Sequence, residues 1–110
     1  MRRLLLVAAL PCCAFSALAF ELVEGEIALS APQCTLFVVQ TGPGFSLLRE
    51  DSYYSLFEGN HVRGALHTLG SHDIEIVGEI TLGVTIEDWG LNLEQAKAIF
   101  YPRCEPRLVP

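Results

Sequence analysis

The amino-acid sequence predicts a small, mainly β protein: an antiparallel barrel of five to six strands followed by one short C-terminal helix. Three observations predict it. Short runs rich in β-branched and aromatic residues alternate in polarity, glycine and proline punctuate them, and a single helical pattern comes last. The chain has 110 residues, of which 51% are hydrophobic and 18% charged. This composition excludes a disordered polar chain, a coiled coil and a collagen-like repeat.

Residues 1–19 are typical of a secretory signal peptide. Two arginines give a positive start, an apolar stretch follows, and Ala17-Leu18-Ala19 offers the small side chains that signal peptidase reads. We expect cleavage before Phe20, which leaves residues 20–110 as a single β-rich domain. A membrane anchor is the alternative. It is disfavoured because proline and serine interrupt the run, which is barely long enough to span a bilayer, a span that takes about 20 apolar residues.

The processed chain is acidic. Cleavage removes two of the seven basic residues and none of the 13 acidic ones, which leaves five basic residues and a net charge of −8. Such a surface repels nucleic-acid phosphates and anionic lipid. We therefore expect no nucleic-acid partner, no stable membrane insertion and a secreted or periplasmic location.

The first expected elements are a lead-in strand and a hairpin. A short strand is expected around residues 26–29, before Pro32. Residues 34–41 (CTLFVVQT) are apolar on both faces, which is typical of a central strand. Gly42-Pro43-Gly44 predicts a turn, so residues 45–49 should return as the hairpin partner.

A second hairpin is predicted from the alternation in residues 61–69 and 73–86. Pairing across a three-residue loop places apolar residues opposite apolar ones and basic residues opposite acidic ones. The aligned pairs are Leu69–Asp73, Thr68–Ile74, His67–Glu75, Leu66–Ile76, Ala65–Val77 and Arg63–Glu79. The second strand is expected to continue to its end with a bend or bulge at Gly78 or Gly83.

A short helix is expected over residues 93–101. Asn92 is typical of an N-cap, with Gln95 at the capping-box position, and Pro102 is expected to end the helix. Three residues can share its apolar face, namely Ala96, Ile99 and Phe100.

Cys34 and Cys104 are the cysteines that remain after processing. An even count in an exported protein favours a disulfide, and two cysteines allow one intramolecular pairing. The alternatives are a dimer joined through these thiols and a metal site, although the paired C-x-x-C spacing of a zinc site is absent. The disulfide would fasten the C-terminal helix to the sheet.

Closure into a barrel would hide both edges of such a sheet. In pattern the strands are similar to OB-like or SH3-like barrels, without a motif specific to either. An open antiparallel meander covered by the helix is the alternative.

Two groups of side chains are candidate sites. The aromatic residues Tyr53, Tyr54, Phe57 and Trp89 suit a binding surface, because rings with polar edges contact sugars and peptides well. The alternative, which we favour, is that Phe57 and one tyrosine are core while Trp89 covers a barrel end.

A metal site is the second candidate. His67, His72 and Asp73 lie around the predicted hairpin tip, where imidazole and carboxylate could bind a divalent ion. A solvated hairpin with a His67–Glu75 cross-strand pair is the favoured alternative. The neighbouring carboxylates Glu50-Asp51 and Glu87-Asp88 would point to opposite faces of a strand, so we expect capping and turn roles rather than catalysis.

The sequence specifies no activity. It contains no nucleophile elbow, zinc-protease motif, phosphate-binding loop or dinucleotide fingerprint. We therefore expect no catalytic residue, no cofactor and no enzyme. The first hypothesis is a small exported accessory or binding domain that acts on a protein, peptide or glycan. The alternatives are a metal-binding protein or hydrolase using His67, His72 and Asp73, and a structural envelope component.

Overall fold

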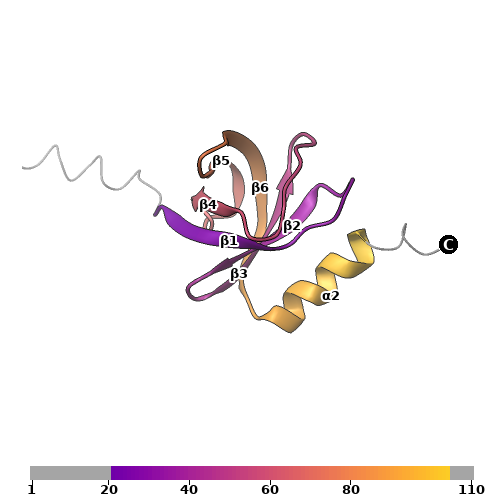
Figure 1. Cartoon of the computed structure of the whole chain (residues 1–110). Coiled ribbons are helices and arrows are strands. Elements are labelled where there is room, and N and C mark those ends of the chain that lie inside the picture. The colour runs from indigo at the N-terminus through magenta and orange to yellow at the C-terminus, as the bar shows by residue number, and fades with distance from the viewer. Residues whose placement is uncertain (1–20, 105–110) are drawn as a thin grey trace, which may run out of the picture.

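A computed structural model describes residues 21–104. They form a closed barrel of six antiparallel strands with one helix outside it (Figure 1). The strands are β1 (Val23–Leu29), β2 (Leu36–Thr41), β3 (Gly44–Glu50), β4 (His61–Gly64), β5 (Gly70–Ile76) and β6 (Ile80–Leu91), and the helix is α2 (Leu93–Cys104). The predicted barrel is confirmed and the open meander is excluded. The signal-peptide prediction, on residues 1–19, lies outside the described residues.

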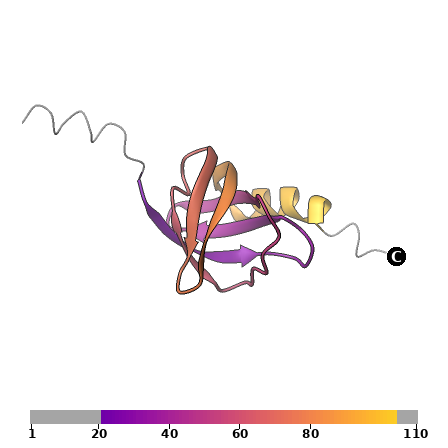
Figure 2. The same cartoon turned by 90° about the horizontal axis from the view of Figure 1, so that it is seen from above.

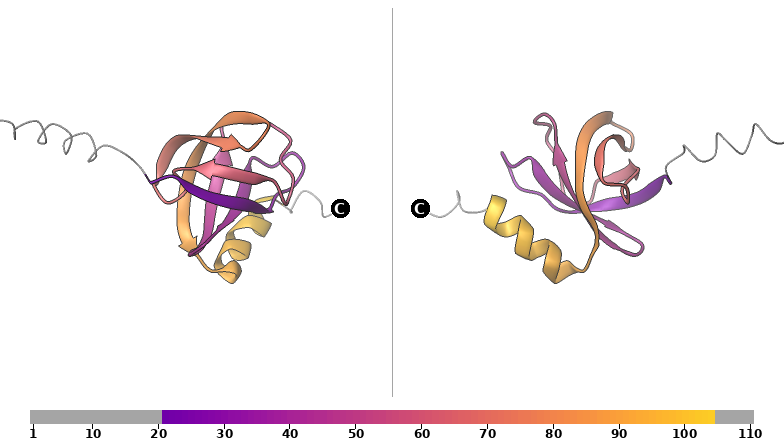
Figure 3. Two further views of the ribbon diagram at one scale, coloured as in Figure 1. Left: turned by 60° about the vertical axis from the view of Figure 1, so that its left-hand side comes forward. Right: turned by 180° about the vertical axis from the view of Figure 1, so that it is seen from behind.

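The barrel consists of two three-stranded meanders. The order around it is β1-β2-β3-β6-β5-β4, and β4 pairs back with β1. The ring of strands is seen from two sides in Figure 3. Because β3 and β4 lie on opposite sides of this ring, residues 51–60 must cross one end of the barrel to connect them. We call these residues the crossing segment.

Strand β2 is apolar on both faces because it has a core on each side. Phe37 and Val39 point into the barrel, and Leu36 and Val38 point toward α2. The helix lies outside the barrel (Figure 2) and packs against β2 and β3. The hairpin of β2 and β3 is confirmed, with Thr41 paired to Gly44 around a two-residue loop.

The predicted register of the second hairpin is wrong by four residues. Strand β4 pairs with β5 through Val62–Ile76 and Arg63–Glu75, so Arg63 faces Glu75 and not Glu79. The reason is that residues 65–69 form a loop and not a strand. Leu66 in this loop is fully buried in the barrel core, and its carbonyl accepts a hydrogen bond of 2.8 Å from the Ser46 hydroxyl. Residues 65–69 therefore place Leu66 in the core at the barrel end and do not form the predicted cross-strand pairs.

The single strand predicted over residues 73–86 is in fact another hairpin. Strands β5 and β6 pair from Gly70–Ile86 to Ile76–Ile80, and the chain reverses at Gly78, which has a φ of 83°. Glycine adopts this left-handed conformation without the strain that a side chain would bring. Gly83, the other predicted bend, lies within β6 opposite Asp73.

The helix begins as predicted and ends later. The Gln95 amide donates to Asn92 Oδ1 (2.8 Å), and the Asn92 amide donates to Gln95 Oε1 (2.9 Å), which confirms the capping box. Pro102 lies inside α2, so the prediction that it ends the helix is wrong. Because Pro102 is in the last turn, it removes one backbone hydrogen bond and only two helical residues follow it. No helix among the described residues is long and apolar enough to cross a bilayer.

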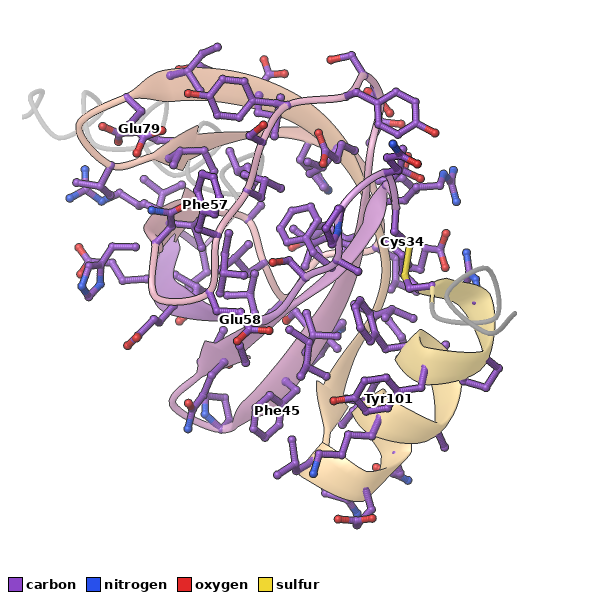
Figure 4. The ribbon with its side chains drawn as sticks, turned by 45° about the vertical axis from the view of Figure 1, so that its right-hand side comes forward. Cys34, Phe45, Phe57, Glu58, Glu79 and Tyr101 are labelled. Atoms are coloured by element: carbon purple, nitrogen blue, oxygen red, sulfur yellow. A yellow bond between two sulfur atoms is a disulfide. The ribbon has the colours of Figure 1, made fainter. Side chains whose placement is uncertain are left out.

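The predicted disulfide joins Cys34 to Cys104, whose Cα atoms are 5.5 Å apart. Figure 4 shows its sulfur atoms between the β1–β2 loop and the end of α2. Cys104 is fully buried in the core between α2 and the barrel. The bridge therefore fixes both the helix end and the loop that contains Cys34.

Candidate functional site

The crossing segment has an inner and an outer side. Tyr54 and Leu56 pack against the barrel core, whereas Tyr53, Ser55 and Phe57 between them are exposed. Tyr53 is 74% exposed and Phe57 is 65% exposed. The alternation follows from an extended backbone, in which successive side chains point to opposite sides. The segment covers the end of the barrel and presents two large rings outward.

Side-chain hydrogen bonds hold the crossing segment in place. The Tyr54 hydroxyl lies 2.9 Å from a carboxylate oxygen of Glu79, on the β5–β6 loop, and this contact raises the pKa of Tyr54. The Ser30 hydroxyl donates to the Leu56 carbonyl over 3.2 Å. The Tyr54 amide donates to Glu50 Oε1 over 2.9 Å. The segment is therefore tied to β3, to the β5–β6 loop and to the end of β1.

A cavity of about 720 Å³ lies between the crossing segment and the β1–β2 loop. Figure 4 places Phe57 and Glu58 on the first of these and Cys34 on the second. The lining comprises Ser30 to Cys34 of the loop, Tyr53 to Glu58 of the segment, and Phe37 and Glu50 of the barrel strands. A cavity of this volume is within the range that small ligands occupy in proteins.

Glu50 is the chemically distinctive residue of the cavity. On β3 it follows Ser46 and Leu48 in the alternation that points into the barrel, and it is only 5% exposed. Its Oε1 accepts a hydrogen bond from the Tyr54 amide. Its Oε2 has no hydrogen-bond or ion-pair partner within residues 21–104. Burial raises the pKa of the Glu50 carboxyl, and the hydrogen bond from Tyr54 opposes this shift only in part.

The structure brings together three of the four aromatic residues that the sequence singled out. Tyr53, Tyr54 and Phe57 all line the cavity. Phe57 is exposed and so does not belong to the core, which corrects the alternative interpretation. Trp89 lies near the other end of β3, because β6 pairs Asp88 with Leu47 and Leu91 with Phe45. It covers the ring of His67, with centroids 4.7 Å apart and planes at 22°.

The histidines have separate surroundings. Thr41 donates its hydroxyl proton to the Gly44 carbonyl (3.0 Å), so His67 Nε2, 3.0 Å from the same hydroxyl, is the donor to Thr41. His72 Nε2 lies 3.3 Å from the carbonyl oxygen of Leu69. The expected His67–Glu75 pair is absent, because Glu75 contacts Arg63 at 3.2 Å.

The metal site predicted from His67, His72 and Asp73 gains no support. Within residues 21–104, no group of three or more His, Cys, Asp or Glu side chains is placed to hold a metal ion. Asp73 pairs across the sheet with Gly83, and His72 with Val84, while the His67 ring is stacked on Trp89. The three side chains therefore have different neighbours and different directions.

Sequence reasoning missed Glu50 as a site residue. Because Glu50 precedes Asp51, the sequence predicts a capping or turn role for it. The hydrogen bond that its carboxylate accepts from the Tyr54 amide does support the turn. The signal that could have found it is the strand alternation. Ser46, Leu48 and Glu50 are two residues apart, so they share the inward face of the strand, which the sequence predicted up to residue 49.

A second hollow, of about 260 Å³, lies between β1, the β2–β3 turn and His61. It is smaller and contains no aromatic residue except this histidine, so the larger cavity is the stronger candidate for a binding site. Comparisons of the chain with protein-family models, with curated proteins and with solved structures found no match.

Proposed function

We propose that the protein is a small exported binding domain without catalytic activity, and that it holds a protein, peptide or glycan partner in the cavity under the crossing segment. The observation that carries this proposal is the pair of exposed rings, Tyr53 and Phe57, beside a cavity of about 720 Å³. Large exposed aromatic rings are costly in water and are enriched at the centres of binding surfaces. A bound partner that covers these two rings would remove their apolar surface from water.

The lining favours recognition over catalysis. Aromatic rings offer stacking surfaces, and serine hydroxyls and carboxylates offer hydrogen bonds. Cys34 is held in a disulfide and is not available as a nucleophile. The lining includes no histidine to act as a general base toward the serines.

Both walls of the cavity are braced before any partner arrives. The disulfide holds the β1–β2 loop, and Tyr54 ties the crossing segment to Glu50 and Glu79. A preformed site loses little conformational entropy on binding, which favours affinity.

A screen with two probe sets tests the proposal: a phage-displayed library of random heptapeptides and an array of neutral and charged oligosaccharides. Ligands found with the processed protein are measured again with the double variant Tyr53→Ser/Phe57→Ser. We expect affinity to fall about tenfold or more, because each lost ring contact costs on the order of 1 kcal/mol.

Leu69→Ser is the matched control, since Leu69 is also exposed, at 59%, but lies in the loop between β4 and β5 at the other end of the barrel. It should leave the affinity unchanged. If neither probe set yields a ligand, or if the double variant binds as tightly as the parent, the cavity is not the binding site.

A further inference from the structure

Glu50 is a buried carboxylate with no counter-charge among the described residues. It is nine-tenths or more buried, it lines the cavity, and one of its oxygens has no partner among the described residues. A buried ionised carboxylate is unfavourable unless it is paired. Burial raises the pKa of the Glu50 carboxyl, and a cation placed beside the carboxylate would oppose this shift.

Among residues 21–104, no lysine or arginine forms an ion pair or hydrogen bond with Glu50. Arg49 and Arg103 contact Glu87 on the outer face, and Arg63 contacts carboxylates on β1 and β5. Within the described part of the chain, the cavity lining includes no lysine, arginine or histidine, whereas Glu58 adds a second carboxylate. A positively charged occupant would therefore meet attraction from two carboxylates and no competing cation in the lining.

The rest of the lining suits the stem of a basic side chain. Rings from Tyr53, Tyr54 and Phe57 contribute to the same cavity as the Glu50 carboxylate. Lysine and arginine have apolar stems that pack on rings, and their cationic heads interact favourably with ring faces and carboxylates. This combination distinguishes a basic side chain from a neutral sugar, which has no charge to offset that of Glu50.

The backbone of the crossing segment favours a peptide. Its side chains alternate between core and solvent, and the amides of Ser55 and Leu56 donate no hydrogen bond to any group within residues 21–104. Successive amides of an extended backbone point to opposite edges, so one of these two amides at a time can donate a main-chain hydrogen bond to a second extended chain.

We propose that the cavity binds a lysine or arginine side chain of an extended peptide, with the cationic head on the Glu50 carboxylate and the peptide backbone along the crossing segment. The inference rests on the proposed function, because it requires the cavity to be the binding site. It adds the chemical class of the occupant and the residue that selects it.

The test uses four blocked heptapeptides with one neutral sequence and a central Lys, Arg, Gln or Glu, together with a glucosamine trisaccharide. The ¹⁵N-labelled processed protein is titrated with each probe. We expect the Lys and Arg peptides to bind about tenfold or more tightly than the Gln peptide, as charge-assisted hydrogen bonds allow. The amides that shift should lie in residues 30–34 and 53–58.

Glu50→Gln should bind the Lys peptide only as tightly as the parent protein binds the Gln peptide. Glutamine keeps an oxygen for the Tyr54 amide, and circular dichroism checks that the variant is folded. Glu94→Gln is the control, because it removes an exposed carboxylate of α2 and so makes the net charge less negative by the same single unit. It should retain the preference for Lys and Arg.

The possible failures are distinguishable. If peptides bind at residues 53–58 with equal affinity whatever their central residue, or if Glu50→Gln keeps the preference, Glu50 does not select a cation and the broader binding function stands. If the trisaccharide binds through Glu50 and the peptides do not, the occupant is an amino sugar.

If basic peptides shift only amides outside the cavity, the attraction is a general surface effect and this proposal is wrong. If no probe of either class shifts the cavity amides, both proposals lose their support.

Discussion

The fold shifts the pKa values of Glu50 and Glu87 in opposite directions. Burial raises the pKa of Glu50, which forms no ion pair with any residue from 21 to 104. Hydrogen bonds and charge from Arg103, and then from Arg49, lower the pKa of Glu87, although its partial burial opposes the shift. Glu87 links three elements, because its partners come from α2 and β3 and it lies on β6 itself. The two residues therefore predict opposite responses of stability to pH.

Glu50→Gln should be at least as stable as the parent at neutral pH. Because the folded-state pKa of Glu50 is raised, the folded and unfolded states are both protonated in acid, and stability is lost as pH rises from the unfolded-state pKa through the folded-state pKa. Glutamine removes that loss, so its advantage should shrink in acid. Thermal unfolding across this pH range checks the result. A lower midpoint at neutral pH would show that the ionised carboxylate serves the fold through the Tyr54 amide.

Glu87→Gln should lower stability at neutral pH. The folded-state pKa of Glu87 is depressed, so its contribution is present above the unfolded-state pKa and is lost as pH falls through the folded-state pKa. We expect a loss of about 0.5–1 kcal/mol, since both arginines are partly exposed. Urea unfolding at neutral and acid pH measures it, and Glu21→Gln, which removes an exposed carboxylate, is the control. A difference that persists unchanged in acid would rule out the ion pairs as its cause.

At the scale of elements, α2 depends on contacts at both of its ends. The capping box satisfies amides at the start, and the Cys34–Cys104 disulfide holds the end beyond Pro102. A 12-residue helix is marginal by itself in water. Its stability therefore comes from packing, through residues such as Phe100, on the outer face of β2 and β3.

Cys104→Ser, or reduction, should lower the unfolding midpoint by several degrees or more and loosen α2 first. The bridge joins residues 70 apart in sequence, and the entropy of closing such a loop sets an upper limit of about 4.4 kcal/mol on its contribution. Amide exchange in residues 93–104 should accelerate before exchange in the barrel strands. Cys34 lines the cavity, so amides of the β1–β2 loop should shift as well. A variant as stable as the parent would show that the bridge contributes nothing to folding.

In the molecule as a whole, acidic side chains outnumber basic ones. The described residues contain four basic and twelve acidic side chains, a balance of −8. This matches the balance expected for the whole processed chain, so most of its excess negative charge belongs to the barrel and α2. Basic partners are attracted over a distance of about 8–10 Å at physiological salt.

The exported protein should begin at Phe20. The prediction follows from the small side chains of Ala17-Leu18-Ala19 after an apolar run. Intact-mass measurement of exported material, without reduction, checks both this N-terminus and the disulfide. A product that keeps residues 4–15 would contradict cleavage and favour the membrane-anchor alternative.

Features that depend on residues close together in the chain could be predicted from the sequence. Asn92 and Gln95 are three positions apart, so their reciprocal hydrogen bonds follow from local helix geometry. The tight loop between β2 and β3 follows in the same way from Gly42-Pro43-Gly44. With the expected cleavage, only Cys34 and Cys104 remain, which leaves one intramolecular pairing, and the structure contains this disulfide. The closed barrel was predicted from the need to hide the edges of a mainly β sheet.

The positions at which the chain reverses, and the contacts between distant side chains, depend on the packing of the whole barrel and could not be predicted from the sequence. Facing residues of an antiparallel pair point to the same side, so Ile74, Ile76, Ile80 and Leu82 keep one alternation through the turn at Gly78. A period of two is identical for one long strand and for two strands joined by a three-residue loop. Glu50 is a different case: its inward direction follows the strand alternation, but its burial depends on the crossing segment, which covers it only in the folded barrel. Barrel closure then separated Trp89 from Tyr53 and Phe57, because it placed the ends of β3 at opposite ends of the core.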